Sequence, residues 1–346
     1  MFSKLNRRKF ITVVAPSALI GVSSCASLDS YIFEDDSYLK KQVPIVGGGI
    51  SGLYLGQLIR KKGNEFRLFE GSSQLGGRIR SAEGIDYGAS IFSQADHKLN
   101  DLLKEFSLSK EFISKDLFFI PLGTETLIQE MAQRNAGLIP SRSLKLKSKL
   151  IAISKINSYF EMTFETPQGR RTYVSQRLAL ALPPNQWHKV DGLLELSEMA
   201  MMKSWLATLE IENAIKFRLK PSAAKTKTKL IEKSEEGFRY RLLSKGNLGI
   251  EGEIFYMANN KEMTAEKINQ ILADHIKLNR LGDETDSMFD WSSINLIQAA
   301  YYKNKQPFPA QDNPNFQVFG DYSALQKTNT VEGALSEAVR VSEIFV

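Results

Sequence analysis

The chain has few of the residues that form disulfides or bind metal ions, with one cysteine and three histidines in 346 residues. Cys25 has no partner for an internal disulfide, and no cysteine and histidine cluster shows metal-ligand spacing. An apolar run from Ile11 to Val22 is shorter than the roughly 20 residues that cross a bilayer. The sequence therefore excludes a disulfide scaffold and predicts no metal site. The fold is therefore expected to be stabilised by a hydrophobic core and a bound ligand.

Residues 1–24 are predicted to be a signal peptide. Basic residues, an apolar run and small residues follow one another there, which is the order of a secretory signal. Arg7-Arg8 with Lys9-Phe10 resembles the bacterial twin-arginine signal, and Val-Ser-Ser-Cys resembles a lipobox that would be lipidated at Cys25. We expect an exported bacterial protein, periplasmic or anchored to a membrane through Cys25, with residues 25–40 as a tether. An ordinary secretory signal with an incidental cysteine is the alternative.

The charge of the chain gives no indication of a nucleic-acid partner. Its formal net charge is +6, and the leader holds four basic residues and no acidic ones, so the remainder carries only +2. So small a net positive charge does not indicate nucleic-acid binding. Lys145, Lys147 and Lys149 alternate with apolar residues and are predicted to lie on the solvated face of one strand. The remaining 300 or so residues allow one large core or two connected domains.

The strongest local motif is V-P-I-V-G-G-G-I-S-G, in which Gly47, Gly49 and Gly52 form G-x-G-x-x-G. V-P-I-V is predicted to be a buried strand before it, with Pro44 as the strand's first residue or an irregular start, and a helix is predicted after it. A second strand ends in Glu70, close to the spacing of an acid that binds an adenosine ribose. The helix start would present N–H groups to phosphates. The motif predicts a dinucleotide site, with a strand, turn and helix without a ligand as the alternative.

The residues after Glu70 favour a flavin over a nicotinamide. Gly76-Gly77-Arg78 follows directly, and D-Y-G-A-S comes next at 86–90. With these motifs the chain resembles the flavin-containing amine oxidase family, which includes monoamine, polyamine and L-amino-acid oxidases. The resemblance continues in G-D at 320–321 and in the helix start T-V-E-G-A near the end of the chain. A nicotinamide-dependent dehydrogenase is disfavoured by the same segments.

This resemblance implies an α/β fold with a discontinuous, Rossmann-like FAD-binding domain and a smaller α+β substrate domain. We expect the FAD-binding domain to comprise residues 41–93, 121–190 and 315–346, and the substrate domain residues 94–120 and 191–314. The FAD would be non-covalent, because no cysteine near the C-terminus can form a thioether link. The positions that the resemblance implies for FAD binding are Gly47, Gly49, Ile50, Ser51, Gly52, Glu70, Gly71, Gly77, Arg78, Gly88, Ala89, Ser90, Leu150, Gly320, Asp321, Val331 and Ala334.

The implied activity is hydride transfer from an amine, amino acid or polyamine to flavin N5. The electron acceptor would be oxygen or a respiratory quinone or cytochrome. Oxidation of an apolar substrate of the carotenoid, porphyrinogen or prenyl type is an alternative. A non-catalytic flavin-binding protein is an alternative of another class.

The catalytic residues are not identified by the sequence. Many family members have a lysine that holds a water near flavin N5, but Lys225, Lys227 and Lys229 lie in a charged loop and are expected to be solvated. The substrate half is also shorter than the family's usual one. Aromatic residues that flank the amine in relatives have candidate counterparts in Trp291, Tyr301 and Tyr302, with core packing as the alternative for each.

Overall fold

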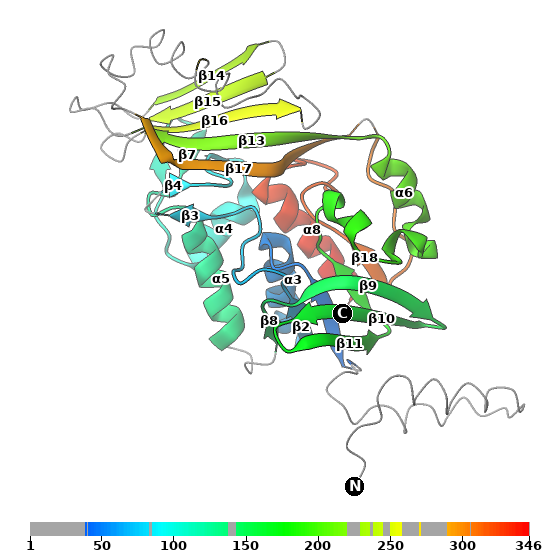
Figure 1. Ribbon diagram of the computed structural model, residues 1–346. Coiled ribbons are helices and arrows are strands. Elements are labelled where there is room, and N and C mark those ends of the chain that lie inside the picture. Colours follow the sequence, from blue (N-terminus) through cyan, green and yellow to red (C-terminus); the bar gives the residue numbers. More distant parts are fainter. Residues whose placement is uncertain are drawn as a thin grey trace, which may run out of the picture. The chain divides into compact units, whose positions relative to one another are not determined.

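The protein is described here from a computed structural model (Figure 1). It describes residues 39, 41–82, 85–137, 143–219, 229–235, 238–244, 250–257, 270, 289–304 and 306–345. The leader, Cys25 and most of the tether lie outside these residues, so their prediction is untested. Leu39–Val346 form one compact unit. None of the helices in the described residues is long and apolar enough to span a membrane.

A five-stranded parallel sheet forms the centre of this unit. Its strands come from distant parts of the chain, and each is short and mostly apolar, as expected for strands covered on both faces. In spatial order they are β18 (Phe316–Val318), β12 (Leu178–Leu180), β1 (Gln42–Val46), β2 (Glu65–Phe69) and β8 (Leu144–Lys145). The predicted α/β, Rossmann-like fold is confirmed by this sheet and its helices. The domain bounds themselves stay a prediction.

Helices pack around α3 (Ile50–Lys61), which follows the glycine loop (Figure 1). α3 contacts both α5 (Glu125–Gly137) and α8 (Val331–Ile344), and α8 also contacts α4 (His97–Glu105). Apolar side chains of these helices and of β1 and β2 form one buried core. The C-terminal helix is thus packed against the first Rossmann helix, although nearly 300 residues separate them.

Two sequence-based details of the strands are wrong. Pro44 is the third residue of β1, not the first, and it pairs with Arg67 of β2. It is tolerated because the ladder with β12 begins only at the next residue, Ile45, so the missing N–H costs no bond on that side. The alternating lysines do not form one strand either: β8 ends at Lys145, the chain turns at Lys147 with φ of 51°, and β9 begins at Lys149.

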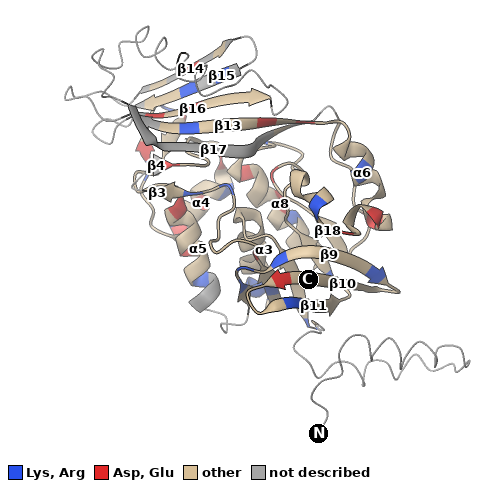
Figure 2. Cartoon of the chain, viewed as in Figure 1, with Lys and Arg blue, Asp and Glu red and all other residues tan. Residues whose placement is uncertain are grey.

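A second five-stranded sheet is antiparallel and supplies residues to the cavity described below. Figure 2 shows both acidic and basic residues on its strand β13. Its order is β14 (Lys229–Glu235), β15 (Phe238–Ser244), β16 (Ile250–Met257), β13 (Leu209–Leu219) and β17 (Phe289–Asn304). Elsewhere, a three-stranded antiparallel sheet contains β9 (Lys149–Ile156), β10 (Tyr159–Thr166) and β11 (Gly169–Ser175).

Small elements complete the described fold. They are β3 (Ser81–Ala82), β4 (Ile85–Asp86), β5 (Phe92–Ser93), β6 (Glu111–Phe112), β7 (Leu117–Phe119), the 3₁₀ turns Pro184–Lys189, Leu193–Glu195 and Ser197–Met199, and α6 (Ala200–Leu206).

The start of α4 depends on a carboxylate from α8. No side chain of α4's own N-cap residue, Asp96, caps this helix. Instead the buried Glu332 accepts hydrogen bonds from the backbone N–H groups of Lys98, at 3.2 Å, and Leu99, at 3.0 Å. We expect Glu332→Ala to lower the free energy of unfolding by about 1–3 kcal/mol, because it leaves one buried and one half-buried backbone donor without their acceptor.

The exposed Glu343 lies on the same helix, so Glu343→Ala is the matched control and should change the free energy of unfolding by less than about 0.5 kcal/mol. Urea unfolding of both variants measures the difference. Equal stability of the two would show that Glu332 is not the cap of α4.

Candidate functional site

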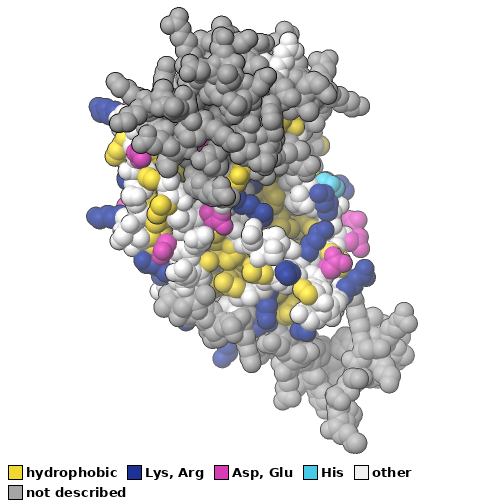
Figure 3. Space-filling view, turned by 60° about the vertical axis from the view of Figure 1, so that its left-hand side comes forward, with side chains coloured by type: hydrophobic (Ala, Val, Ile, Leu, Met, Phe, Trp, Pro, Cys, Tyr) yellow, Lys and Arg dark blue, Asp and Glu magenta, His cyan; other side chains and the backbone are white. Residues whose placement is uncertain are grey.

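A cavity of about 560 Å³ lies where the ends of several parallel strands meet. It is lined by Val46 at the end of β1, Phe69 at the end of β2 and Ala181 just after β12. The chain leaves β1 toward β2 on one side, while β12 lies on the other side, so β1 is a topological switch point. Open α/β sheets bind their ligands at this place. Figure 3 shows hydrophobic and basic side chains gathered on one described face of the molecule.

The first glycine turn has the geometry that a bound phosphate requires. Gly47 has φ of 113°, and a Cβ at Gly52 would lie 2.1 Å from the carbonyl oxygen of Gly47, so both positions need glycine. Gly49 is different. It precedes α3 without any side-chain cap, and a Cβ added there would meet no atom within 4 Å. The start of α3 therefore opens onto empty space, which fits an anionic group.

A second glycine turn, Gly76-Gly77, packs directly on the first. Gly76 forms a parallel bridge with Gly49, and its N–H donates to the carbonyl of Gly48 at 2.8 Å. Both residues have positive φ, 109° for Gly76 and 60° for Gly77. A Cβ at Gly77 would lie 3.3 Å from the Cα of Gly49. The two turns together form one wall of the cavity.

Glu70 holds the base of the first turn. One of its carboxylate oxygens accepts the Gly48 N–H at 2.7 Å, and the other accepts the Ser72 N–H at 2.7 Å. A carboxylate oxygen has more than one acceptor position, so these bonds leave capacity for a ribose hydroxyl. Glu70 therefore orders the loop as well as lining the cavity, a role that the spacing argument did not include.

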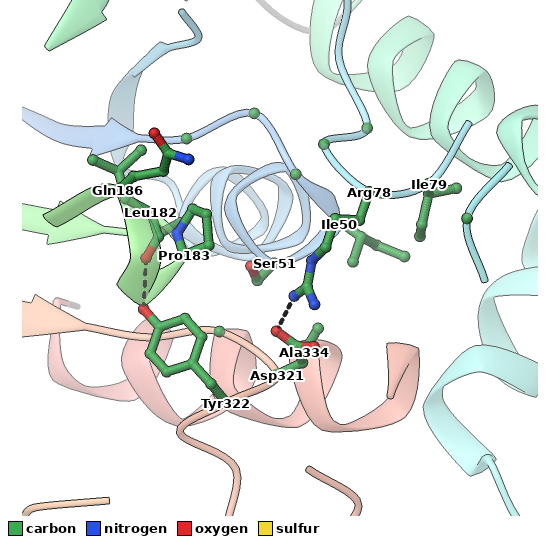
Figure 4. A pocket seen from close by; sticks show the side chains of 18 of the residues that line it. Ile50, Ser51, Arg78, Ile79, Leu182, Pro183, Gln186, Asp321, Tyr322 and Ala334 are labelled. Carbon is green, nitrogen blue, oxygen red and sulfur yellow. Dashed lines mark hydrogen bonds and ion pairs between the residues drawn. The ribbon is translucent and has the colours of Figure 1, made fainter. Parts of the chain in front are cut away.

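Arg78 and Asp321 meet across the cavity from opposite ends of the chain (Figure 4). The guanidinium is ion-paired with the Asp321 carboxylate and lies 5.4 Å from the centre of the Tyr302 ring. Asp321 follows β18, and its carbonyl oxygen accepts the N–H of Asn329 at 3.0 Å. The charge of Arg78 is therefore anchored by the C-terminal segment, which brings two predicted site residues together.

The N-terminus of α8 also reaches the cavity, through Val331 and Ala334. Thr330 caps this helix, because its hydroxyl oxygen accepts the Gly333 N–H at 3.0 Å, and its carbonyl accepts the Ala334 N–H at 3.1 Å. Two N–H groups of this helix start, those of Gly333 and Ala334, are therefore already bonded within the helix.

Tyrosines form the wall near Asp321, and their hydroxyls bond to protein atoms. Tyr302 donates to Asn185 Oδ1 at 3.0 Å. The Tyr322 hydroxyl lies 3.0 Å from the carbonyl oxygen of Leu182 (Figure 4). Burial raises the pKa of both phenols. Tyr302 lines the cavity and is also packed in the buried core, so its contact with a substrate stays a prediction. Trp291 and Tyr301 lie on β17, and their side chains fall outside the described residues.

Most of the predicted site residues line this one cavity. Gly52 and Ser90 do not: the first packs behind the loop, and the second bonds to buried polar groups beneath it. The predicted residues that line the cavity are Gly47, Gly49, Ile50, Ser51, Glu70, Gly71, Gly77, Arg78, Gly88, Ala89, Leu150, Tyr302, Gly320, Asp321, Val331 and Ala334.

Sequence reasoning missed two buried charged residues of the cavity wall, Lys216 on β13 and Glu253 on β16. They form an ion pair. The sequence feature that could have identified Lys216 is the segment I-E-N-A-I-K-F-R-L, a strand-like pattern in which Lys216 lies between apolar neighbours. Of the three lysines predicted to lie in a charged loop, Lys225 and Lys227 lie outside the described residues, and Lys229 is instead the first residue of β14.

Comparisons with known proteins agree with this geometry. Residues 45–106 match a family model described as an NAD(P)-binding Rossmann-like domain. Among solved structures, putrescine oxidase bound to putrescine is 13% identical, with a TM-score of 0.63 over 88% of this chain and 99% of that chain. Cyclohexylamine oxidase from Brevibacterium oxydans is 11% identical, with a TM-score of 0.64 over 87% and 98%.

A flavoprotein/dehydrogenase from Cytophaga hutchinsonii is 12% identical, with a TM-score of 0.57 over 88% of this chain and 77% of that chain. At these identities the matches establish the fold. The chain shares the fold of these amine oxidases, as the motifs predicted, and residues 45–106 are similar to an NAD(P)-binding Rossmann-like domain.

The empty space in front of Gly49 gives a direct test of the site. Gly49 has φ of −71°, which any residue adopts, so Gly49→Val should fold. Its side chain would occupy the space before α3, and we expect FAD binding to weaken at least tenfold, as measured by quenching of flavin fluorescence.

Gly63→Ala is the control, because Gly63 has φ of 81° with open space around it and lies away from the cavity. It should cost about 1–2 kcal/mol of stability by backbone strain without changing FAD binding. Unaltered FAD binding by Gly49→Val would rule out a phosphate site at this helix.

Proposed function

We propose that the chain is an FAD-dependent oxidoreductase that oxidises a small amine. The observation that carries this proposal is the convergence of three separate segments on one cavity. The two glycine turns, the Gly320-Asp321 segment and the start of α8 come from opposite ends of the chain and line the same space. A simple Rossmann-type nicotinamide site needs only the first glycine turn and neither of the C-terminal segments.

The residues of the cavity fit FAD. The open space at Gly49 accepts a pyrophosphate before the helix start, and the carboxylate of Glu70 lies beside it for the adenosine ribose. Leu150 lines the cavity next to this end, from β9. The N-terminal donors of α8 provide positive potential at another part of the wall. Bound FAD would supply the hydride acceptor that no side chain can provide.

The chain's own residues would bind the cofactor, orient the substrate and shield both from water. Arg78 has a fixed position because Asp321 neutralises it, so its planar donors face the cavity in one orientation. Tyr302 and Tyr322 provide an apolar, water-excluding wall, since their hydroxyls are already bonded to protein atoms. Phe255 and Ala214 continue this wall on the antiparallel sheet. A substrate would need little more than orientation in such a site.

The amine itself is proposed on two grounds. Solved structures with this fold include putrescine oxidase and cyclohexylamine oxidase. The cavity also carries the buried carboxylates Glu253 and Asp321, which pair with the buried Lys216 and the half-buried Arg78. These two cations are already paired within the protein and do not favour an α-carboxylate.

Anaerobic reduction of the flavin tests the activity. We expect at least one compound from a panel of monoamines, diamines and polyamines to bleach the bound flavin, because hydride transfer needs no oxygen. Dithionite is the positive control, and NADH and the matching amino acids are the comparison donors. A flavin that dithionite reduces but no organic donor bleaches would favour a non-catalytic flavin-binding protein, and bleaching by NADH alone would favour a nicotinamide-linked enzyme.

We also propose export and anchoring through the leader, on the evidence of the sequence alone. Cys25→Ser should move the protein from the membrane fraction to the soluble periplasmic fraction, because it removes the lipid attachment. Arg7→Lys with Arg8→Lys should retain it in the cytoplasm. A Cys25→Ser protein that stays in the membrane fraction would contradict the lipid anchor.

A further inference from the structure

The backbone of Tyr302, at the edge of the antiparallel sheet, is held by a side chain from the C-terminal segment. Tyr302 lies on β17, the last strand in the order of this sheet, and is opposite Ile211 of β13. Asn329 Oδ1 accepts the Tyr302 N–H at 2.8 Å, and Asn329 Nδ2 donates to the Tyr302 carbonyl oxygen at 2.6 Å. The amide group of one side chain therefore forms the two bonds that a residue of a neighbouring antiparallel strand would form.

The backbone of Asn329 makes a further connection. Its φ is 58°, in the left-handed region, where asparagine is enriched among residues other than glycine. In this conformation its N–H donates to the carbonyl oxygen of Asp321 at 3.0 Å. The next residue, Thr330, is the N-cap of α8. Asn329, which itself lines the cavity, thus joins the edge of the antiparallel sheet to the Asp321 segment and to the start of α8.

The ring of Tyr302 extends from this anchored backbone to the wall of the cavity. Only 1% of the residue is exposed, and its hydroxyl donates to Asn185 Oδ1 at 3.0 Å, so the side chain is held at both ends. The Arg78 guanidinium lies over the ring, 5.4 Å from its centre. At that distance a cation and a ring face attract each other. The position of the Tyr302 ring therefore affects the direction of the guanidinium.

These contacts form a closed circuit of four residues. Arg78 contacts the Tyr302 ring and is ion-paired with Asp321 (Figure 4). Asp321 accepts the backbone N–H of Asn329, and the side chain of Asn329 holds the backbone of Tyr302. Asn329 therefore holds both of the residues that contact the guanidinium, so it can fix the direction of Arg78 without touching it.

We propose that Asn329 is a positioning residue, which sets the direction of the Arg78 guanidinium at the cavity wall by holding Tyr302 and Asp321. This rests on the proposed function only in taking the cavity as the FAD site. The side chain of Asn329 makes the contact with Tyr302, whereas its backbone N–H makes the contact with Asp321. A substitution can therefore remove the first contact and keep the second.

The first arm of the test uses the chain without FAD, so it does not depend on the proposed function. Asn329→Gly tolerates the positive φ and keeps the N–H that Asp321 accepts, but it removes the side-chain amide. The N–H and the carbonyl oxygen of the buried Tyr302 then lose this partner. We expect the unfolding constant, measured by urea unfolding, to rise at least about tenfold.

Asn157→Gly is the matched control. Asn157 is exposed in the turn between β9 and β10, has a φ of 56°, nearly equal to that of Asn329, and does not line the cavity. The same substitution there makes the same change in backbone freedom, so the unfolding constant should change less than about threefold. Equal effects of the two substitutions would overturn the proposal, because the side chain of Asn329 would then hold nothing.

The second arm uses FAD binding and asks whether Asn329 acts through Arg78. Asn329→Gly should weaken FAD binding at least about threefold, as measured by quenching of flavin fluorescence, because the guanidinium is no longer held against the Tyr302 ring. In the Arg78→Met background the same substitution should change the FAD affinity less than about twofold, because the group that Asn329 positions is already absent. Equal weakening in both backgrounds would show that Asn329 acts independently of Arg78, and would overturn the proposal.

Asn329→Asp is the second variant for this arm and replaces Asn329→Gly if that variant does not fold. It keeps an acceptor for the Tyr302 N–H but loses the Nδ2 donor, so it should also weaken FAD binding only where Arg78 is present. Failure of wild type to bind FAD would contradict the proposed function, while the unfolding arm would still decide whether the Asn329 side chain holds Tyr302.

Discussion

Backbone groups of two glycine turns meet at the carboxyl end of β1, and the rest of the site depends on that meeting. Gly49 and Gly76 form a bridge, and a Cβ at Gly77 would lie only 3.3 Å from the Cα of Gly49. The first turn sets the start of α3. The second sets the direction in which Arg78 leaves the backbone. Displacing either turn would disturb both the phosphate site and the cation beside it.

Charged groups then tie the distant segments to these turns. Asp321, near the end of the chain, neutralises Arg78, and Glu70 binds the first turn through the Gly48 N–H. Lys216 reaches the segment after Arg78 from the antiparallel sheet. Each tie is buried or half-buried, where an unpaired partner would be costly. The cavity is therefore assembled by pairing, and its cations Arg78 and Lys216 are already neutralised by carboxylates of the protein.

Local patterns in the sequence were sufficient for the parallel core and for most of the cavity. The glycine spacing, Glu70, Arg78 and the start of α8 are signals that backbone geometry imposes on residue type, so they can be read without a structure. The same reasoning placed Pro44 at the start of its strand and joined β8 to β9, because neither the start of the β12 ladder nor a turn at Lys147 leaves a local mark. Lys216 and Glu253 were missed because their pairing joins strands more than 30 residues apart, and alternation alone does not tell a buried charge from a solvated one.

The central claim is that these paired segments form an FAD site, and the flavin content of the purified protein tests it most directly. The protein without its leader should be yellow, and heating should release a flavin that chromatography identifies as FAD, in an amount near one per chain. A colourless protein that also fails to take up added FAD would contradict the account. The glycine turns would then be a structural feature of the fold without a ligand.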